Sequence, residues 1–312
     1  MKVVILYLAF LILIFSFIPF AFVSCNKGGD INSKTTITLY DKENGKISDI
    51  NLEEYIIGVV SAEMPAEFSA EALKSQAVAA RTYALRKINK ELPEHKGADL
   101  CSDFAHCQAY SDTKKLRGLW KKNYKKYSKK IKNAVVATQG EYLEYDDEFA
   151  ITVFHSCSNG ITEKASDVWG GDIPYLKCVE SKGDYFKKDY KTLLDFQKDE
   201  FVSRLEEFLK TNIDTSLKPI DNIKYTEGGN VEEITLFGNN IKGTDIRSIF
   251  SLKSSAFDLK VTDNIFTFTV YGNGHGVGMS QYGAEKMASD GISYDKILEH
   301  YYPGTKLKNL NN

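Results

Sequence analysis

The sequence has no excess of positive charge, because its 312 residues contain 40 Lys and Arg against 42 Asp and Glu, a formal net charge of −2. Phosphate binding needs clustered basic side chains, so this balance argues against nucleic acid as a partner. The chain also lacks a P-loop, a G-x-G-x-x-G turn and any internal repeat. It does have the length and apolar content for a substantial core, in one large domain or two small ones.

One stretch, residues 114–132, departs from the overall charge balance because it is densely basic. Its apolar residues recur at helical spacing and predict a single apolar face formed by Leu116, Leu119, Trp120, Tyr124, Tyr127 and Ile131. Two interpretations remain open: a solvated basic helix face, or a surface that meets an anionic polymer or a membrane.

The N-terminus contains an uncharged run, residues 3–23, that is long enough to cross a bilayer as a helix. It could be an uncleaved anchor, a cleaved signal peptide or a lipoprotein signal ending at Cys25. We favour the anchor, because Phe22 stands where a lipobox usually has Leu and no small-x-small cleavage site precedes Cys25. The expected organisation is an anchor over residues 1–25, a flexible linker over 26–34 and one extracytoplasmic domain over 35–312.

The remaining periodicities predict helices and strands in mixed order. Helices are expected over residues 52–62, 69–89, 114–132, 200–210 and 244–250, and strands over 35–40, 141–145, 149–155, 223–236 (a hairpin), 257–262 and 265–271. This order lacks the regular alternation of a doubly wound sheet. It therefore predicts an α+β fold, with helices and antiparallel strands around one cleft.

Glu63 ends the first predicted helix, and its immediate neighbours in Gly58-Val-Val-Ser-Ala-Glu63-Met-Pro are almost all apolar. Burial would disfavour its charged form and raise its pKa, which keeps a carboxylic acid protonated at neutral pH. Such an acid can donate a proton to a substrate. Taken alone, the pattern also fits a structural or solvated glutamate, which is the commoner case.

A glycine-rich segment, residues 271–283, follows a predicted strand and opens a helix. Alternate glycines leave the backbone bare, so a bulky ligand could lie against it. Groups that can hydrogen-bond sugar hydroxyls and amides edge this segment: His275, Ser280, Gln281 and Tyr282. A simple bend between strand and helix is the alternative.

A second polar segment runs from His155-Ser156 to a loop that carries Trp169 and Tyr175. Aromatic faces stack on pyranose rings, so the segment could form a sugar-binding rim. Alternatively, Trp169 and Tyr175 belong to the core.

Four residues that can ligate a metal fall within a stretch of thirteen: His95, Cys101, His106 and Cys107. They are the ligand inventory of a closed, structural Cys2His2 zinc site, although their spacing differs from that of a zinc finger. A disulfide between Cys101 and Cys107 is the alternative in an exported protein. For Cys157 and Cys178, a disulfide and two free thiols are both open.

At these residues the chain resembles the stage II sporulation protein D family of lytic transglycosylases, which is related to amidase enhancers. The matching stretches are Glu54-Tyr55 through Ser61-Ala-Glu63-Met-Pro, Leu73-Lys-Ser-Gln76-Ala-Val-Ala-Ala-Arg81-Thr-Tyr83-Ala, Phe154-His155-Ser156 to Leu176, and Gly274-His275-Gly-Val-Gly-Met-Ser280-Gln281-Tyr282-Gly-Ala. The resemblance implies that Glu63 is the catalytic acid/base. It also implies a glycan cleft with these binding residues: Gln76, Arg81, His155, Ser156, Tyr175, Lys177, His275, Ser280, Gln281 and Tyr282.

The chemistry that the resemblance implies is cleavage of the MurNAc-GlcNAc bond of peptidoglycan strands, to 1,6-anhydro ends, without a cofactor. The implied setting is the space between forespore and mother cell during engulfment, with the stage II sporulation proteins P and M as partners. A non-catalytic, glycan-binding activator of an amidase is the rival expectation. A zinc hydrolase is disfavoured, because no Asp or Glu stands in a metalloprotease arrangement with the Cys and His residues.

Overall fold

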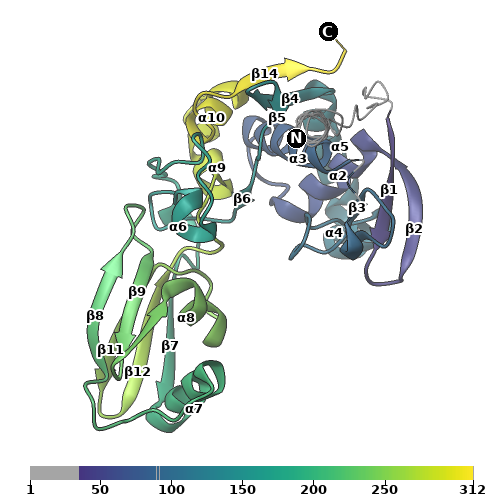
Figure 1. Ribbon diagram of the computed structural model, residues 1–312. Coiled ribbons are helices and arrows are strands. Elements are labelled where there is room, and N and C mark those ends of the chain that lie inside the picture. The colour runs from purple at the N-terminus through teal and green to yellow at the C-terminus, as the bar shows by residue number, and fades with distance from the viewer. Residues whose placement is uncertain (1–34, 89, 91, 312) are drawn as a thin grey trace, which may run out of the picture. The chain divides into compact units, whose positions relative to one another are not determined.

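Helices and small, mostly antiparallel sheets are interspersed along the chain in the computed structural model, which describes residues 35–88, 90 and 92–311 (Figure 1). The described residues belong to one compact unit, Asn32–Asn312. The predicted α+β class is confirmed, with sheets of two or three strands and no doubly wound sheet among these residues.

Helix α3 (Ala70–Lys87) is central to the helical region, where it contacts the other helices and strand β4. Its packing face consists largely of small side chains, such as the fully buried Ala77, Ala80 and Ala84, which allow neighbours to approach closely. The neighbouring helices are α2 (Leu52–Glu63), α5 (Tyr124–Ala137), α9 (Gln281–Ser289) and α10 (Tyr294–Tyr301).

Three small sheets border these helices. Strand β1 (Thr36–Asp41) pairs with β2 (Lys46–Asn51) and β3 (Leu100–Cys101), and β4 (Glu141–Tyr145) pairs with β5 (Glu148–Phe149) and β14 (Lys306–Asn309). The third is a parallel pair of β6 (Phe154–His155) and β13 (Met279–Ser280). This last pair holds the glycine-rich turn beside the His155-Ser156 segment.

The β-rich region, residues 191–271, has a hydrophobic core of its own, in which aromatic side chains such as Phe201, Phe266 and Phe268 are fully buried. Its two sheets are β11 (Phe257–Thr262), β12 (Ile265–Tyr271) and β7 (Lys191–Gln197), and β10 (Asn239–Lys242), β9 (Val231–Leu236) and β8 (Ile220–Tyr225). Helices α7 (Lys198–Leu209) and α8 (Gly243–Ile249) lie beside these sheets (Figure 1), and their buried side chains contribute to the same core.

The basic segment forms two helices instead of the single one expected. Helix α4 (Thr113–Trp120) is separated from α5 by a 3-10 turn, Lys121–Asn123, in which Lys121 has a positive φ of 45°. A non-glycine residue in this conformation interrupts a continuous helix. The break lies directly after Trp120.

The expected membrane anchor over residues 3–23 lies outside the described residues. Within the part of the chain that the structure describes, no helix has the length and apolar character needed to cross a bilayer. The longest of the helices described, α3, has 18 residues and carries charged side chains such as Glu71, Lys74 and Arg81. The prediction of a single-pass protein at the cell membrane is therefore corrected, because nothing in the described chain supports it.

Candidate active site

A pocket of about 620 Å³ lies at the C-terminal end of α2. This volume is within the range of small-ligand sites. Its wall combines residues far apart in the sequence, from the end of α2, the α4–α5 region, the segment after β6, a 3-10 turn, the glycine-rich turn and the start of α9. They are Glu63, Trp120, Tyr127, Ser156, Lys187, Asn273, Gln281 and Tyr282. The structure thus brings together Glu63, Ser156, Gln281 and Tyr282 from the residues expected to form the site.

Glu63 is the last residue of α2 and is only partly exposed. Its Oε1 accepts a hydrogen bond of 2.8 Å from the backbone N–H of Ala109. Burial raises the pKa of this carboxyl above its ordinary value of 4.5, while the hydrogen bonds from Ala109 and from the Gln281 side chain act in the opposite direction. The net result is a carboxyl at a pocket wall whose raised pKa favours the protonated form more than in a solvated glutamate.

The segment that carries Ala109 can approach α2 closely because residue 58 is glycine. A Cβ at Gly58 would lie 2.3 Å from a ring carbon of Tyr110, which is closer than packing permits. The backbone N–H of Ser111 also donates to the Gly58 carbonyl at 3.3 Å. A side chain at position 58 would therefore collide with the residue that directly follows Ala109.

A buried network positions the start of α9. Asp184, which is fully buried, accepts hydrogen bonds from the Ser280 hydroxyl and from the hydroxyl and N–H of Ser158. The same Ser280 oxygen caps α9 by accepting from the Gly283 N–H at 3.1 Å. Because Gln281 and Tyr282 follow directly, this network holds both at the pocket wall.

His275 braces the glycine-rich turn and does not line the pocket wall. Its Nε2–H donates to the Phe154 carbonyl at 3.0 Å, and its Nδ1 accepts from the Val277 N–H at 3.1 Å. Burial lowers the pKa of His275 to about 4 and that of His155 to about 3. Both imidazoles are therefore neutral near pH 7 and serve as structural hydrogen-bonding groups.

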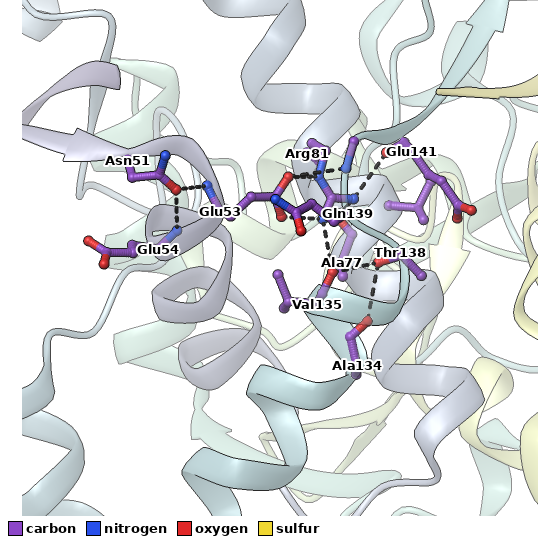
Figure 2. Close-up of polar contacts among 12 residues, drawn as sticks. Asn51, Glu53, Glu54, Ala77, Arg81, Ala134, Val135, Thr138, Gln139 and Glu141 are labelled. Carbon is purple, nitrogen blue, oxygen red and sulfur yellow. Dashed lines mark hydrogen bonds and ion pairs between the residues drawn. The ribbon is translucent and has the colours of Figure 1, made fainter. Parts of the chain in front are cut away.

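Arg81 is fully buried and forms a bidentate ion pair with Glu53, through Nε–Oε1 and Nη2–Oε2 distances of 2.8 and 2.6 Å. Its Nη1 donates to the Glu141 carbonyl at 3.0 Å (Figure 2). These contacts tie α3 to the first turn of α2 and to β4. Arg81 therefore belongs to the framework that supports the site, and its side chain is not at the pocket wall.

The other expected binding residues do not line the pocket and differ in burial. Gln76 is fully buried, with its oxygen 3.5 Å from the amide nitrogen of Gln281. Tyr175 is a core residue whose hydroxyl accepts from the Ile151 N–H at 2.6 Å, whereas Lys177 is exposed. Trp169 is 51% exposed and packs against His275, so it is not a core residue.

Several pocket residues could not be assigned from the sequence. Trp120 and Tyr127 lie on the apolar face expected of the basic segment, and their rings pack edge to face at 5.7 Å. The periodicity identified this face, but only the fold shows that it meets Glu63. Lys187 and Asn273 carried no sequence signal that would place them here.

The cluster of His95, Cys101, His106 and Cys107 brings its ligand atoms within 4.8 Å of one another. The His95 Nε2–Cys107 Sγ, Cys101 Sγ–His106 Nδ1 and Cys107 Sγ–His106 Nδ1 distances are 3.1, 3.5 and 3.7 Å. Tetrahedral zinc, with Zn–S of about 2.3 Å and Zn–N of about 2.0 Å, separates its ligands by about 3.5 Å. The four side chains thus fit a closed metal site.

The described cysteines are free thiols in the structure: Cys101, Cys107, Cys157 and Cys178. No disulfide therefore competes with the Cys101 and Cys107 ligand positions. The cluster of His and Cys side chains is also linked to Glu63, because Ala109 follows Cys107 by two residues and its N–H donates to the carboxyl.

Comparison with known proteins gives a consistent assignment. A family model for stage II sporulation protein matches residues 40–145. The stage II sporulation protein D of Bacillus subtilis (strain 168) is 40% identical over 277 residues, which cover 88% of this chain and 79% of that protein. The protein of the same name from Bacillus amyloliquefaciens is 39% identical over 281 residues, with the same shares covered. The amidase enhancer of Bacillus subtilis is 28% identical over 302 residues, which cover 80% of this chain and 40% of that protein. The chain belongs to the stage II sporulation protein D family.

Proposed function

We propose that the chain is a peptidoglycan lytic transglycosylase with Glu63 as its single acid/base catalyst. The observation that carries the proposal is a carboxyl with a raised pKa at a pocket wall, held by one backbone N–H and one amide. Ordinary glycosidases use two carboxylates, one of which activates water or attacks the sugar. A lytic transglycosylase needs one, because the sugar supplies its own nucleophile.

The reaction would proceed in two proton transfers. Protonated Glu63 donates to the glycosidic oxygen as the bond between C1 of N-acetylmuramic acid and O4 of N-acetylglucosamine breaks, and O4 leaves as a hydroxyl. The resulting carboxylate takes the proton of the C6 hydroxyl while O6 bonds to C1, which gives the 1,6-anhydro ring and restores the acid. Positioned proton transfer supplies about 10²- to 10⁴-fold of the rate, and alignment of the sugar's own hydroxyl supplies more.

The rest of the pocket suits a sugar chain. Trp120 and Tyr282 offer aromatic faces for pyranose rings, and the side chains of Ser156, Gln281 and Asn273 offer hydrogen-bonding groups. In this proposal the cluster of His95, Cys101, His106 and Cys107 holds a structural zinc ion. That ion braces the loop leading to Ala109 and takes no part in the proton transfers.

The proposed setting is cell-wall remodelling at the septum and during engulfment in sporulation. The stage II sporulation proteins P, an amidase, and M are the proposed partners. An amidase that strips stem peptides from the glycan would supply the strands on which this chain acts.

Mass spectrometry of products from stripped glycan strands tests the proposal. Wild-type protein should release fragments with 1,6-anhydro ends, and Glu63→Gln should slow their release by at least about 10²-fold. Glu54→Gln is the matched control, since Glu54 is an exposed glutamate on the same helix. Retained cleavage by Glu63→Gln would eliminate Glu63 as the catalyst.

The similarity to an amidase enhancer supports a second candidate, a glycan-binding activator without catalysis of its own. The same assay separates the two candidates. Unchanged strands with purified protein alone, together with faster stem-peptide release when the amidase is added, would favour the activator.

A further inference from the structure

Lys187 is a cation at the wall of the Glu63 pocket that the proposed proton transfers do not use. It directly follows the 3-10 turn Asp184–Phe186, where its N–H donates to the Asp184 carbonyl at 3.2 Å. Only 10% of its side chain is exposed. The buried Asp184 network thus fixes the backbone from which this side chain enters the pocket.

The Lys187 ammonium has no close counterion among the described residues, 35–88, 90 and 92–311. Its one partner there is Asp189, at 3.6 Å, and the other Asp189 oxygen is bound to Lys253 at 2.7 Å. An ammonium largely removed from water and held by one long contact retains donors for a ligand. Glu63 forms no ion pair among these residues either. Lys187 is therefore not the partner of the Glu63 carboxyl and is available for a ligand.

We propose that Lys187 binds the free lactyl carboxylate of N-acetylmuramic acid, and so makes the pocket select strands stripped of stem peptides. The inference rests on the proposed function. In a peptide-bearing strand the same lactyl carbonyl is part of a neutral amide, and the negative charges lie further along the peptide. N-acetylglucosamine has no lactyl group at all. An ammonium pairs more strongly with a carboxylate than with an amide oxygen.

Binding measurements in a Glu63→Gln background test this, because cleavage is suppressed and the full chain can be titrated calorimetrically. The probes are a stripped GlcNAc-MurNAc tetrasaccharide, the N-acetylglucosamine tetramer and a peptide-bearing strand of the same length. Lys187→Met should weaken binding of the stripped tetrasaccharide by about tenfold or more. It should leave binding of the N-acetylglucosamine tetramer unchanged.

Two further variants control for the fold and for general charge. Lys188→Met removes the exposed neighbouring cation and should change neither affinity. Lys187→Arg keeps the charge and should retain the preference for the stripped tetrasaccharide. This preference should also decline with added salt in protein that carries Lys187.

Three outcomes overturn the inference. An equal loss for both tetrasaccharides means that Lys187 only shapes the pocket. An equal loss for the peptide-bearing strand means that it binds a peptide carboxylate instead. Full affinity in Lys187→Met removes its role altogether. The proposed function fails separately, if wild-type protein shows the Lys187-dependent preference and yet produces no anhydro ends.

Discussion

The two ends of helix α2 carry glutamates in opposite situations. Glu53, in the first turn, accepts hydrogen bonds from Nε and Nη2 of Arg81 and from the Gly140 N–H. Glu63, at the last turn, has one backbone N–H and one amide, and no cation. The N-terminal end of a helix favours negative charge and the C-terminal end disfavours it, which widens the contrast.

The difference separates a structural role, at Glu53, from the proposed catalytic role, at Glu63. A carboxylate held by a bidentate guanidinium connects helix α2 to helix α3. A partly buried carboxyl without a cation retains its proton more readily and can give it to a substrate. Substitutions at the two ends of α2 test this distinction. Those at the Glu53 end should mainly lower stability, and those at the Glu63 end should mainly affect the reaction.

The largest effect on stability is expected from Arg81→Met. Removing the guanidinium leaves the Glu53 carboxylate buried without a cation, which should lower the free energy of unfolding by about 3–5 kcal/mol. Chemical denaturation measures the change. The double variant Glu53→Gln with Arg81→Met should recover part of the loss, because no unpaired charge remains. A loss below about 1 kcal/mol in the single variant would contradict the supporting role.

Metal removal should have the next largest effect, because it acts on the loop that leads to Ala109. Cys107→Ser should abolish stoichiometric zinc, measured by elemental analysis, and lower Tm by on the order of 10 °C. Cys178→Ser, at a free thiol outside the cluster, is the matched control and should keep its zinc. Protein purified with an intact cluster and no zinc would contradict the assignment of the metal.

Local sequence patterns predicted most of the helices and strands. The helix expected over residues 52–62 is α2, Leu52–Glu63, and the hairpin expected over residues 223–236 is formed by β8 and β9. Strand β7 was missed, because its Leu193 is exposed and its pairing with β12 joins segments about seventy residues apart. Periodicity cannot reveal a partner so distant in sequence.

The site residues also fall into those that a local motif identifies and those that only tertiary contacts place. Glu63 and the turn before Gln281 stand in contiguous motifs, so the sequence could identify them. The role of Arg81 depends on Glu53, 28 residues away, and Lys187 reaches the pocket only through the packing of its 3-10 turn. Such contacts come from tertiary structure, which a motif does not encode.

A smaller effect, on the pH dependence of activity, is expected from Gln281→Leu in the pocket itself. The Gln281 hydrogen bond favours the ionised form of Glu63, so its loss should raise the pKa of this carboxyl further. The reaction needs the protonated acid, and the alkaline limb of kcat/KM should therefore move to higher pH. Gln197→Leu, at an exposed residue of the β-rich region, should leave the profile in place. A shift to lower pH would contradict the contact.

The smallest effect concerns stability in Glu63→Gln. The folded-state pKa of Glu63 lies above its unfolded value of 4.5, so ionisation costs folding free energy. In the wild type this stability is fully present below pH 4.5 and declines as pH rises through the folded-state pKa. Glutamine does not titrate, so the variant should gain stability relative to wild type over that window and keep a constant advantage above it. Paired urea denaturation at pH 4 and pH 8 measures the difference. A pH-independent difference would mean that Glu63 is as well solvated in the fold as in the unfolded chain, and the contrast between the two ends of α2 would be lost.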